Sequence, residues 1–178
     1  MSIGAASLAT GAGTVALFSD SELSGGNTVS VGTLELSVVD GSETTVLEVE
    51  NAGPGSSGSE TKELKNVGSL NGTVDFEFGT YESLEGSNPD SETDTTGDGE
   101  LEDEITVTIT FGGTEVRSGT FEQVFDGTTA DSDVPLTSFA TKDLVFEWAI
   151  PEDVGNDAQG DIVRGAVTIV LKQHNLES

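Results

Sequence analysis

Strict alternation of apolar and polar residues is the feature that most constrains the fold of this chain. The stretch "EITVTITF" (104–111) alternates in this way, as do "TVDFEF" (73–78) and "DLVFEWAI" (143–150). The apolar members of the first stretch are Ile105, Val107, Ile109 and Phe111. A period of two is the period of a β-strand, so each stretch predicts a strand with one face in the core and one in solvent.

Further strands and the turns between them complete the predicted fold. Strands are expected at 28–38, 44–50, 60–67, 116–125 and 165–173. Turn-forming sequences such as "NAGPGSSGS" (51–59) and "FGGT" (111–114) separate the strands. A short turn of helix fits residues 80–86 or 120–126, but no stretch sustains a 3.6-residue period. The chain is therefore predicted to be all-β, an antiparallel, jelly-roll-like β-sandwich of about eight short strands.

An excess of acidic residues restricts the partners of this protein. The sequence has 33 Asp and Glu against 6 Lys and Arg, a formal net charge of -27. Nucleic acids and anionic membrane surfaces would repel such a chain, so neither is an expected partner. A surface adapted to concentrated salt and the binding of divalent cations both explain acidic excess, and the even spread of the charges favours the first. Cysteine is absent, which excludes disulfides and thiolate metal sites.

The N-terminal segment has an unusual composition. Residues 1–18 carry no charge, and no Lys or Arg precedes Lys62. A secretory leader needs a basic region ahead of its apolar stretch, so the segment does not fit that pattern. No later segment has the uncharged length of a membrane span, and a stable span is not expected.

Four short motifs, taken in order, resemble the TasA/camelysin family. They are "GTVALFSDSE" (13–22), "NTVSVGTLELSV" (27–38), "LKNVGSLNGTVDFEF" (64–78) and "WAIPEDVGNDAQGD" followed by "TIVLKQHN" (148–175). The family-like positions are Phe18, Ser19 and Asp20, Asn27 and Thr28, Gly32 to Leu36, the turn Asn66 to Leu70, Asn156, Gln159 and Asp161, and Gln173. Val29 stands where the family usually has an aromatic residue. The similarity is greatest to the strongly acidic versions expected of salt-loving archaea.

The resemblance implies an extracellular protein exported with a SipW-type signal peptidase. Members of that family polymerise into biofilm-matrix fibres or bundling pili that serve adhesion and biofilm cohesion. The implied partners are copies of the same chain, joined head to tail, together with lateral contacts between filaments. Assembly in the family resembles donor-strand complementation, in which an N-terminal strand of one subunit completes the sandwich of its neighbour.

The resemblance and the small side chains of residues 1–18 together suggest a donor strand, with residues 19–178 forming the sandwich domain. The side chains expected to enter the neighbouring subunit are Ile3, Ala5, Leu8, Ala12, Val15, Leu17 and Phe18. Two alternatives are an ordinary first strand of the same sandwich and a helix, which the glycines of the segment disfavour. The alternative function is a monomeric cell-surface β-domain, with or without bound calcium.

The acidic loop "NPDSETDTTGDGELEDE" (88–104) is the best candidate for a metal site, and Ca²⁺ is the cofactor that it suggests. Carboxylates alternate along it as they do in a calcium-binding loop, at Asp94, Asp98, Glu100 and Glu102. Thr96 and Ile105 occupy positions where such a loop carries ligands. A plain solvated acidic loop is the alternative interpretation.

The sequence also bears on glycosylation and on proteolysis. "NGT" at positions 71–73 makes Asn71 a candidate glycosylation site, although Asn-Gly is also a common hairpin turn. Relatives of camelysin have been classed as metallopeptidases, but the sequence contains no HExxH motif and one histidine, His174. Because catalytic zinc sites use several His or Cys ligands, we do not expect an enzyme.

Overall fold

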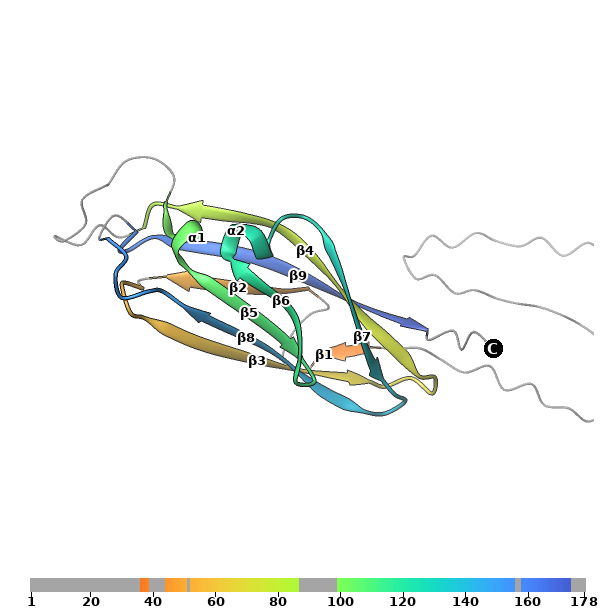
Figure 1. The fold of residues 1–178 in the computed structure, drawn as a ribbon. Coiled ribbons are helices and arrows are strands. Elements are labelled where there is room, and N and C mark those ends of the chain that lie inside the picture. The colour runs from red at the N-terminus through yellow and green to blue at the C-terminus, as the bar shows by residue number, and fades with distance from the viewer. Residues whose placement is uncertain (1–35, 39–43, 51, 87–98, 156–157, 174–178) are drawn as a thin grey trace, which may run out of the picture. The chain divides into compact units, whose positions relative to one another are not determined.

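The computed structural model describes residues 36–38, 44–50, 52–86, 99–155 and 158–173 of the chain. Nine strands and two single-turn helices make up this part (Figure 1). The strands are β1 (Leu36–Val38), β2 (Thr44–Glu50), β3 (Ser57–Asn66), β4 (Gly72–Leu84), β5 (Thr106–Phe111), β6 (Thr114–Thr120), β7 (Thr129–Leu136), β8 (Thr141–Ala149) and β9 (Ile162–Gln173). The helices are α1 (Leu101–Glu104) and α2 (Phe121–Val124). No helix within these ranges has the length and apolar character that crossing a bilayer requires.

The strands form two antiparallel sheets that pack face to face (Figure 1). One sheet has the order β1-β3-β8-β5-β6, and the other has the order β2-β9-β4-β7. Apolar residues of both sheets fill the space between them, as the alternation predicts. Phe76 of β4 and Phe111 of β5 meet there edge to face, with ring centroids 5.5 Å apart. The predicted antiparallel β-sandwich is confirmed.

Most predicted strands are present where the structure describes the chain, although residues 28–35 of the strand expected at 28–38 lie outside the described residues. Two of the elements expected around the strands differ. β4 continues to Leu84, so the helical turn that fits residues 80–86 does not form there. The strand expected at 116–125 ends at Thr120, where α2 begins. The Thr120 hydroxyl accepts a hydrogen bond from the backbone of Gln123, whose side chain accepts one from the backbone of Thr120. This capping box starts a helix inside the stretch predicted as strand, at the other place where a helical turn was expected.

One flank of the sandwich, where β6 and β7 are the edge strands, is closed by α2 and its surroundings. The rings of Phe121 and Phe125 are buried and stack with centroids 4.5 Å apart. The Arg117 guanidinium lies 4.9 Å from the ring centroid of Phe78, and its Nη2 lies 2.6 Å from Asp126 Oδ2. Aromatic packing and an ion pair therefore link the two sheets on this side.

Candidate functional site

The opposite flank of the sandwich has β2 at the edge of one sheet and β1 and β3 at the edge of the other (Figure 1). β1 pairs with β3 only from Leu64 to Asn66. Within the described part of the chain, the segment Ser57–Glu63 of β3 pairs with β8 on one side and with no strand on the other. We call this segment and β2 the open flank. Its unpaired backbone groups can receive an added strand.

The core-facing side of β3 in the open flank is polar. Glu60 and Lys62 lie opposite the buried residues Phe146 and Leu144 of β8, so they face the core. Their side chains form an ion pair with a Nζ–Oε1 distance of 2.7 Å. Inward-facing charge on an edge strand discourages indiscriminate pairing, because an ill-fitting partner would bury the charges without solvating them. The charged pair therefore opposes nonspecific pairing of other strands with this edge.

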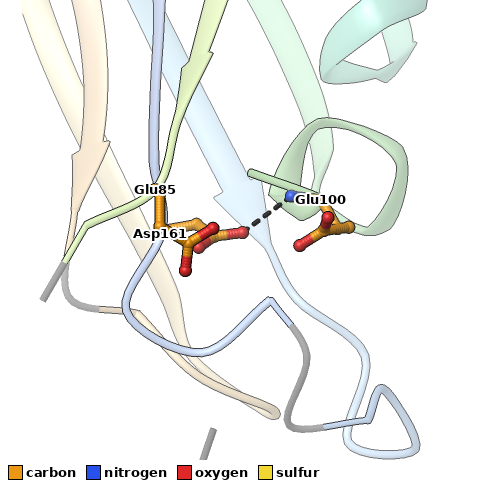
Figure 2. Close-up of side chains that lie close together, drawn as sticks. All are labelled: Glu85, Glu100 and Asp161. Carbon is orange, nitrogen blue, oxygen red and sulfur yellow. Dashed lines mark hydrogen bonds between the residues drawn. The ribbon is translucent and has the colours of Figure 1, made fainter. Parts of the chain in front are cut away.

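A second feature is a group of three carboxylates that we call the acidic cluster: Glu85, Glu100 and Asp161. Glu85 follows the last residue of β4, Glu100 precedes α1 and Asp161 precedes β9. One carboxylate oxygen from each lies within 4.8 Å of the others. Figure 2 shows the three side chains gathered where these segments meet. The fold thus brings together acidic residues that are far apart in the sequence.

Asp161 is the most deeply buried member of the acidic cluster, with none of its surface exposed. Its Oδ2 accepts a hydrogen bond of 2.7 Å from the backbone N–H of Glu100 (Figure 2). Its Oδ1 is also buried and accepts no hydrogen bond from any described residue. A buried carboxylate oxygen is costly unless a hydrogen-bond donor or a cation satisfies it, so Oδ1 of Asp161 is an available acceptor within the acidic cluster.

Close packing around Gly99 brings the segments of the acidic cluster together. A Cβ at this position would lie 2.9 Å from both Asp161 Oδ2 and the Leu84 carbonyl oxygen, so only glycine fits without a shift. The Ser83 hydroxyl lies 3.0 Å from the Gly99 carbonyl oxygen and 2.5 Å from Glu102 Oε2. These contacts fix the end of β4 against the residues that lead into α1.

Negatively charged side chains surround the acidic cluster. Two unit charges 4.8 Å apart repel each other by about 3.5 kcal/mol at an effective dielectric constant of about 20. Burial raises the pKa of the nearby Tyr81 phenol, and the carboxylates of Glu122, Glu102 and Asp103 raise it further. Negative charge around α1 therefore opposes a further anion and favours a cation.

The structure brings one of the four predicted calcium ligands into the acidic cluster. That residue is Glu100, whereas Glu102 lies against Ser83 and is not a member. Asp94 and Asp98 lie outside the described residues. The last part of the predicted loop forms α1. Its first residue, Leu101, and the residue that follows it, Ile105, are fully buried. The loop therefore contributes one carboxylate, and the other two come from the end of β4 and from the residue before β9.

Sequence reasoning missed Glu85 and Asp161 as members of a site. Asp161 belongs to the family-like element near the C-terminal strand, but its partners lie 61 or more residues away. No local spacing connects these positions, so only the fold places them together. The resemblance to the family was the one available signal, and it marked Asp161 without indicating a role.

The remaining predicted positions are placed as follows. Asn71 is exposed, and its Oδ1 accepts a hydrogen bond of 3.0 Å from the backbone of Ser138. Glycosylation of this residue stays a prediction. His174 lies outside the described residues, as do the residues of the expected donor strand, which are Ile3, Ala5, Leu8, Ala12, Val15, Leu17 and Phe18.

The family-like turn "NVGSL" has a structural role that centres on Asn66. This side chain is fully buried, and its Nδ2 donates hydrogen bonds to the carbonyls of Leu70 (2.8 Å) and Leu136 (3.0 Å). Its Oδ1 accepts a hydrogen bond of 2.9 Å from the backbone of Gly68. One amide thus holds the turn between β3 and β4 against the end of β7.

Comparison with known proteins agrees with these motifs. A family model described as camelysin metallo-endopeptidase matches residues 1–111, which is more than half of the 178 residues. A comparison with curated proteins gave no match. The matched region contains the first three of the four motifs and the turn around Asn66. The chain belongs to the TasA/camelysin family.

Proposed function

We propose that this protein is the structural subunit of an extracellular filament, a pilus or biofilm-matrix fibre that serves adhesion and biofilm cohesion. Its membership in the TasA/camelysin family supports this function and an exported location. The observation that carries the proposal is the open flank, where the segment Ser57–Glu63 has one strand partner among the described residues. An added strand would satisfy the backbone groups of this edge.

The added strand is residues 1–18 of a neighbouring copy. These residues are uncharged and mostly small, so they can approach β3 without bringing further charge to the pair formed by Glu60 and Lys62. Each subunit would lend its own segment and receive another, and such head-to-tail contacts produce a filament instead of a closed ring. The partners are therefore other copies of the chain.

The strong negative charge sets the conditions for assembly. Subunits with a formal charge of -27 repel one another unless the medium screens them, and molar salt shortens the screening length to about 3 Å. We therefore assign the filament, and any lateral bundling, to a saline environment such as that of a halophilic archaeon.

A peptidase is the second candidate, because the matching family model is described as a metallo-endopeptidase. The sequence has no HExxH motif and a single histidine, His174. The acidic cluster offers carboxylates alone, whereas catalytic zinc is usually held by several histidines. A structural function accounts for these features better. Casein hydrolysis by the purified protein that persists in protease-deficient preparations would favour the peptidase.

Electron microscopy of the purified full chain in molar salt tests the proposed function. We expect filaments with a regular repeat, and we expect a variant lacking residues 1–17 to remain as discrete folded particles. Discrete particles from the full chain would favour the monomeric cell-surface domain, and normal filaments from the shortened variant would contradict donation by this segment.

Engineered cysteines can locate the contact, because the natural chain has none. We expect Ser7→Cys combined with Thr61→Cys to form disulfides between subunits in filaments. Thr61 lies in the open flank on the face of β3 that points away from the core, and Ser7, which precedes the inward-facing Leu8, would share that face in a docked strand. The matched control combines Ser7→Cys with Ser118→Cys, at an exposed position on β6 at the other edge of the same sheet. Equal crosslinking in both pairs would contradict docking at the open flank.

A further inference from the structure

We propose that Glu85, Glu100 and Asp161 bind one Ca²⁺ ion between the end of β4, the residue preceding α1 and the residue preceding β9. The site is a different feature from the open flank, and it involves neither residues 1–18 nor a second copy of the chain. Its ligand set also differs from the loop that the sequence suggests, because two of the three carboxylates come from outside residues 88–104.

Asp161 supplies the observation that distinguishes this site from an ordinary acidic surface. The residue is completely buried, and its Oδ1 accepts no hydrogen bond from the described residues. It takes part in none of the ion pairs recorded among those residues. The carboxylate is also held in a fixed direction, because the backbone of Glu100 donates to Oδ2. A cation bound to Oδ1 would complete the coordination of this buried group.

The ligand chemistry favours calcium. All three side chains offer oxygen, which suits hard cations, and none offers the nitrogen or sulfur that zinc prefers. Ca²⁺ accepts irregular arrangements of six to eight oxygens that include carboxylates and water, whereas Mg²⁺ requires a smaller, nearly octahedral set. The three carboxylates supply part of the calcium shell, and water would supply the rest.

A pocket borders Glu100 of the acidic cluster. This pocket has a volume of about 140 Å³ and is lined by Glu100, Glu104, Val154, Gly155 and Ala158. Glu100 thus belongs to the acidic cluster and also lines the pocket, so solvent in the pocket can reach this residue. Glu85 and Glu100 are themselves only partly buried, which leaves room for water ligands.

Titration of the full chain with CaCl₂ at constant ionic strength tests the site, with calorimetry and thermal unfolding as readouts. We expect one ion per chain, a dissociation constant of about 10⁻⁴ to 10⁻³ M, and a rise in melting temperature. Magnesium at the same concentrations should produce a much smaller effect. No calcium binding, or equal binding of magnesium, would overturn the assignment.

Two variants separate the site from general screening of charge. Asp161→Asn keeps the shape of the side chain and removes its charge, so we expect calcium affinity to fall at least about tenfold. Glu85→Gln should act in the same direction and serves if Asp161→Asn does not fold. Asp143→Asn, at an exposed position on β8, is the matched control and should bind calcium as the natural chain does. An equal calcium response in the control and in both site variants would contradict the proposal.

Discussion

The indole ring of Trp148 lies against Gly58, its neighbour across the β3–β8 pair. A Cβ at position 58 would lie 2.7 Å from three atoms of the ring, so the ring occupies the space that a side chain would need. Trp148 is the single tryptophan of the chain, and it is half-buried against the core. Its indole is therefore an intrinsic fluorescent probe of the environment at the open flank.

Assembly should change the emission of Trp148. If a strand from a neighbouring copy docks at the open flank, the ring loses water, and we expect the emission maximum to move to shorter wavelength as filaments form. Fluorescence followed during assembly in molar salt measures this shift. The variant lacking residues 1–17 should keep its emission under the same conditions. An unchanged spectrum in fully assembled filaments would contradict docking beside Gly58.

Substitution of Gly58 should destabilise the fold. Gly58→Ala forces the indole to move, and overpacking of this kind typically costs about 1–3 kcal/mol. Chemical denaturation measures the loss, and the emission of Trp148 should shift at the same time. Ser59→Ala is the matched control, because Ser59 is exposed on the opposite face of β3 and should change stability by about 0.5 kcal/mol or less. Equal effects of the two substitutions would refute the steric explanation.

The buried amide of Asn66 should be among the most sensitive positions in the molecule. Asn66→Ala leaves the carbonyls of Leu70 and Leu136 without their donor, and we expect a loss of about 2–4 kcal/mol in the free energy of unfolding. Asn71→Ala, in the same turn but exposed, should cost about 1 kcal/mol or less. Denaturant titration of both variants makes the comparison, and a reversed order would contradict the role assigned to Asn66.

The ion pair between Arg117 and Asp126 should make the stability of the fold depend on pH in a defined way. Hydrogen bonds from Thr128, together with the Arg117 guanidinium, lower the pKa of Asp126. Because the folded-state pKa is the lower one, ionised Asp126 stabilises the fold above its unfolded pKa of about 3.9. That contribution is lost as the pH falls through the folded-state value.

The measurement is the difference in stability between the natural chain and Asp126→Asn as a function of pH. We expect the difference to be largest near neutral pH and to vanish in acid. Asp143→Asn, which is exposed and distant from Arg117, should show little difference at any pH. A difference in stability that stays constant from neutral to strongly acidic pH would indicate that it does not arise from the charge of Asp126.

Salt should control the filaments through the net charge. We expect them to persist in molar salt and to loosen when dialysed to low ionic strength, since repulsion between subunits then acts over about 10 Å or more. Sedimentation of filaments against salt concentration measures this behaviour. Filaments that stay intact at low ionic strength without divalent cations would show that repulsion does not limit assembly.

Much of the sandwich could be predicted, because one buried face per strand imposes a period of two on the sequence. The expected strand at 44–50 coincides with β2, and the other alternating stretches fall in β4, β5 and β8. β7 was missed because its sequence, "TADSDVPL", contains two Asp and a Pro, and because Ser132 interrupts the apolar side formed by Ala130, Val134 and Leu136. α1 was missed because it is a single turn, too short to show a helical period.

The acidic cluster and the environment of Trp148 lay beyond sequence reasoning. Trp148 was expected in the core, but it is half-buried, because it lies next to an edge strand whose facing residue is glycine. The acidic cluster depends on the ends of β4 and β9 meeting near α1, a result of sheet topology. Local patterns indicate which residues face inward, whereas topology decides which of them meet.

The acidic cluster has a consequence for how such a domain would stay folded outside a cell, which is the location that the proposed function implies. Exported domains often rely on disulfides to join distant parts of the chain, but this sequence has no cysteine. An ion held by Glu85, Glu100 and Asp161 would close large loops in the same way, and closure of large loops restricts the unfolded chain most. This crosslink would then be reversible. The calcium concentration of the surrounding water would control it, and oxidants and reductants would not affect it.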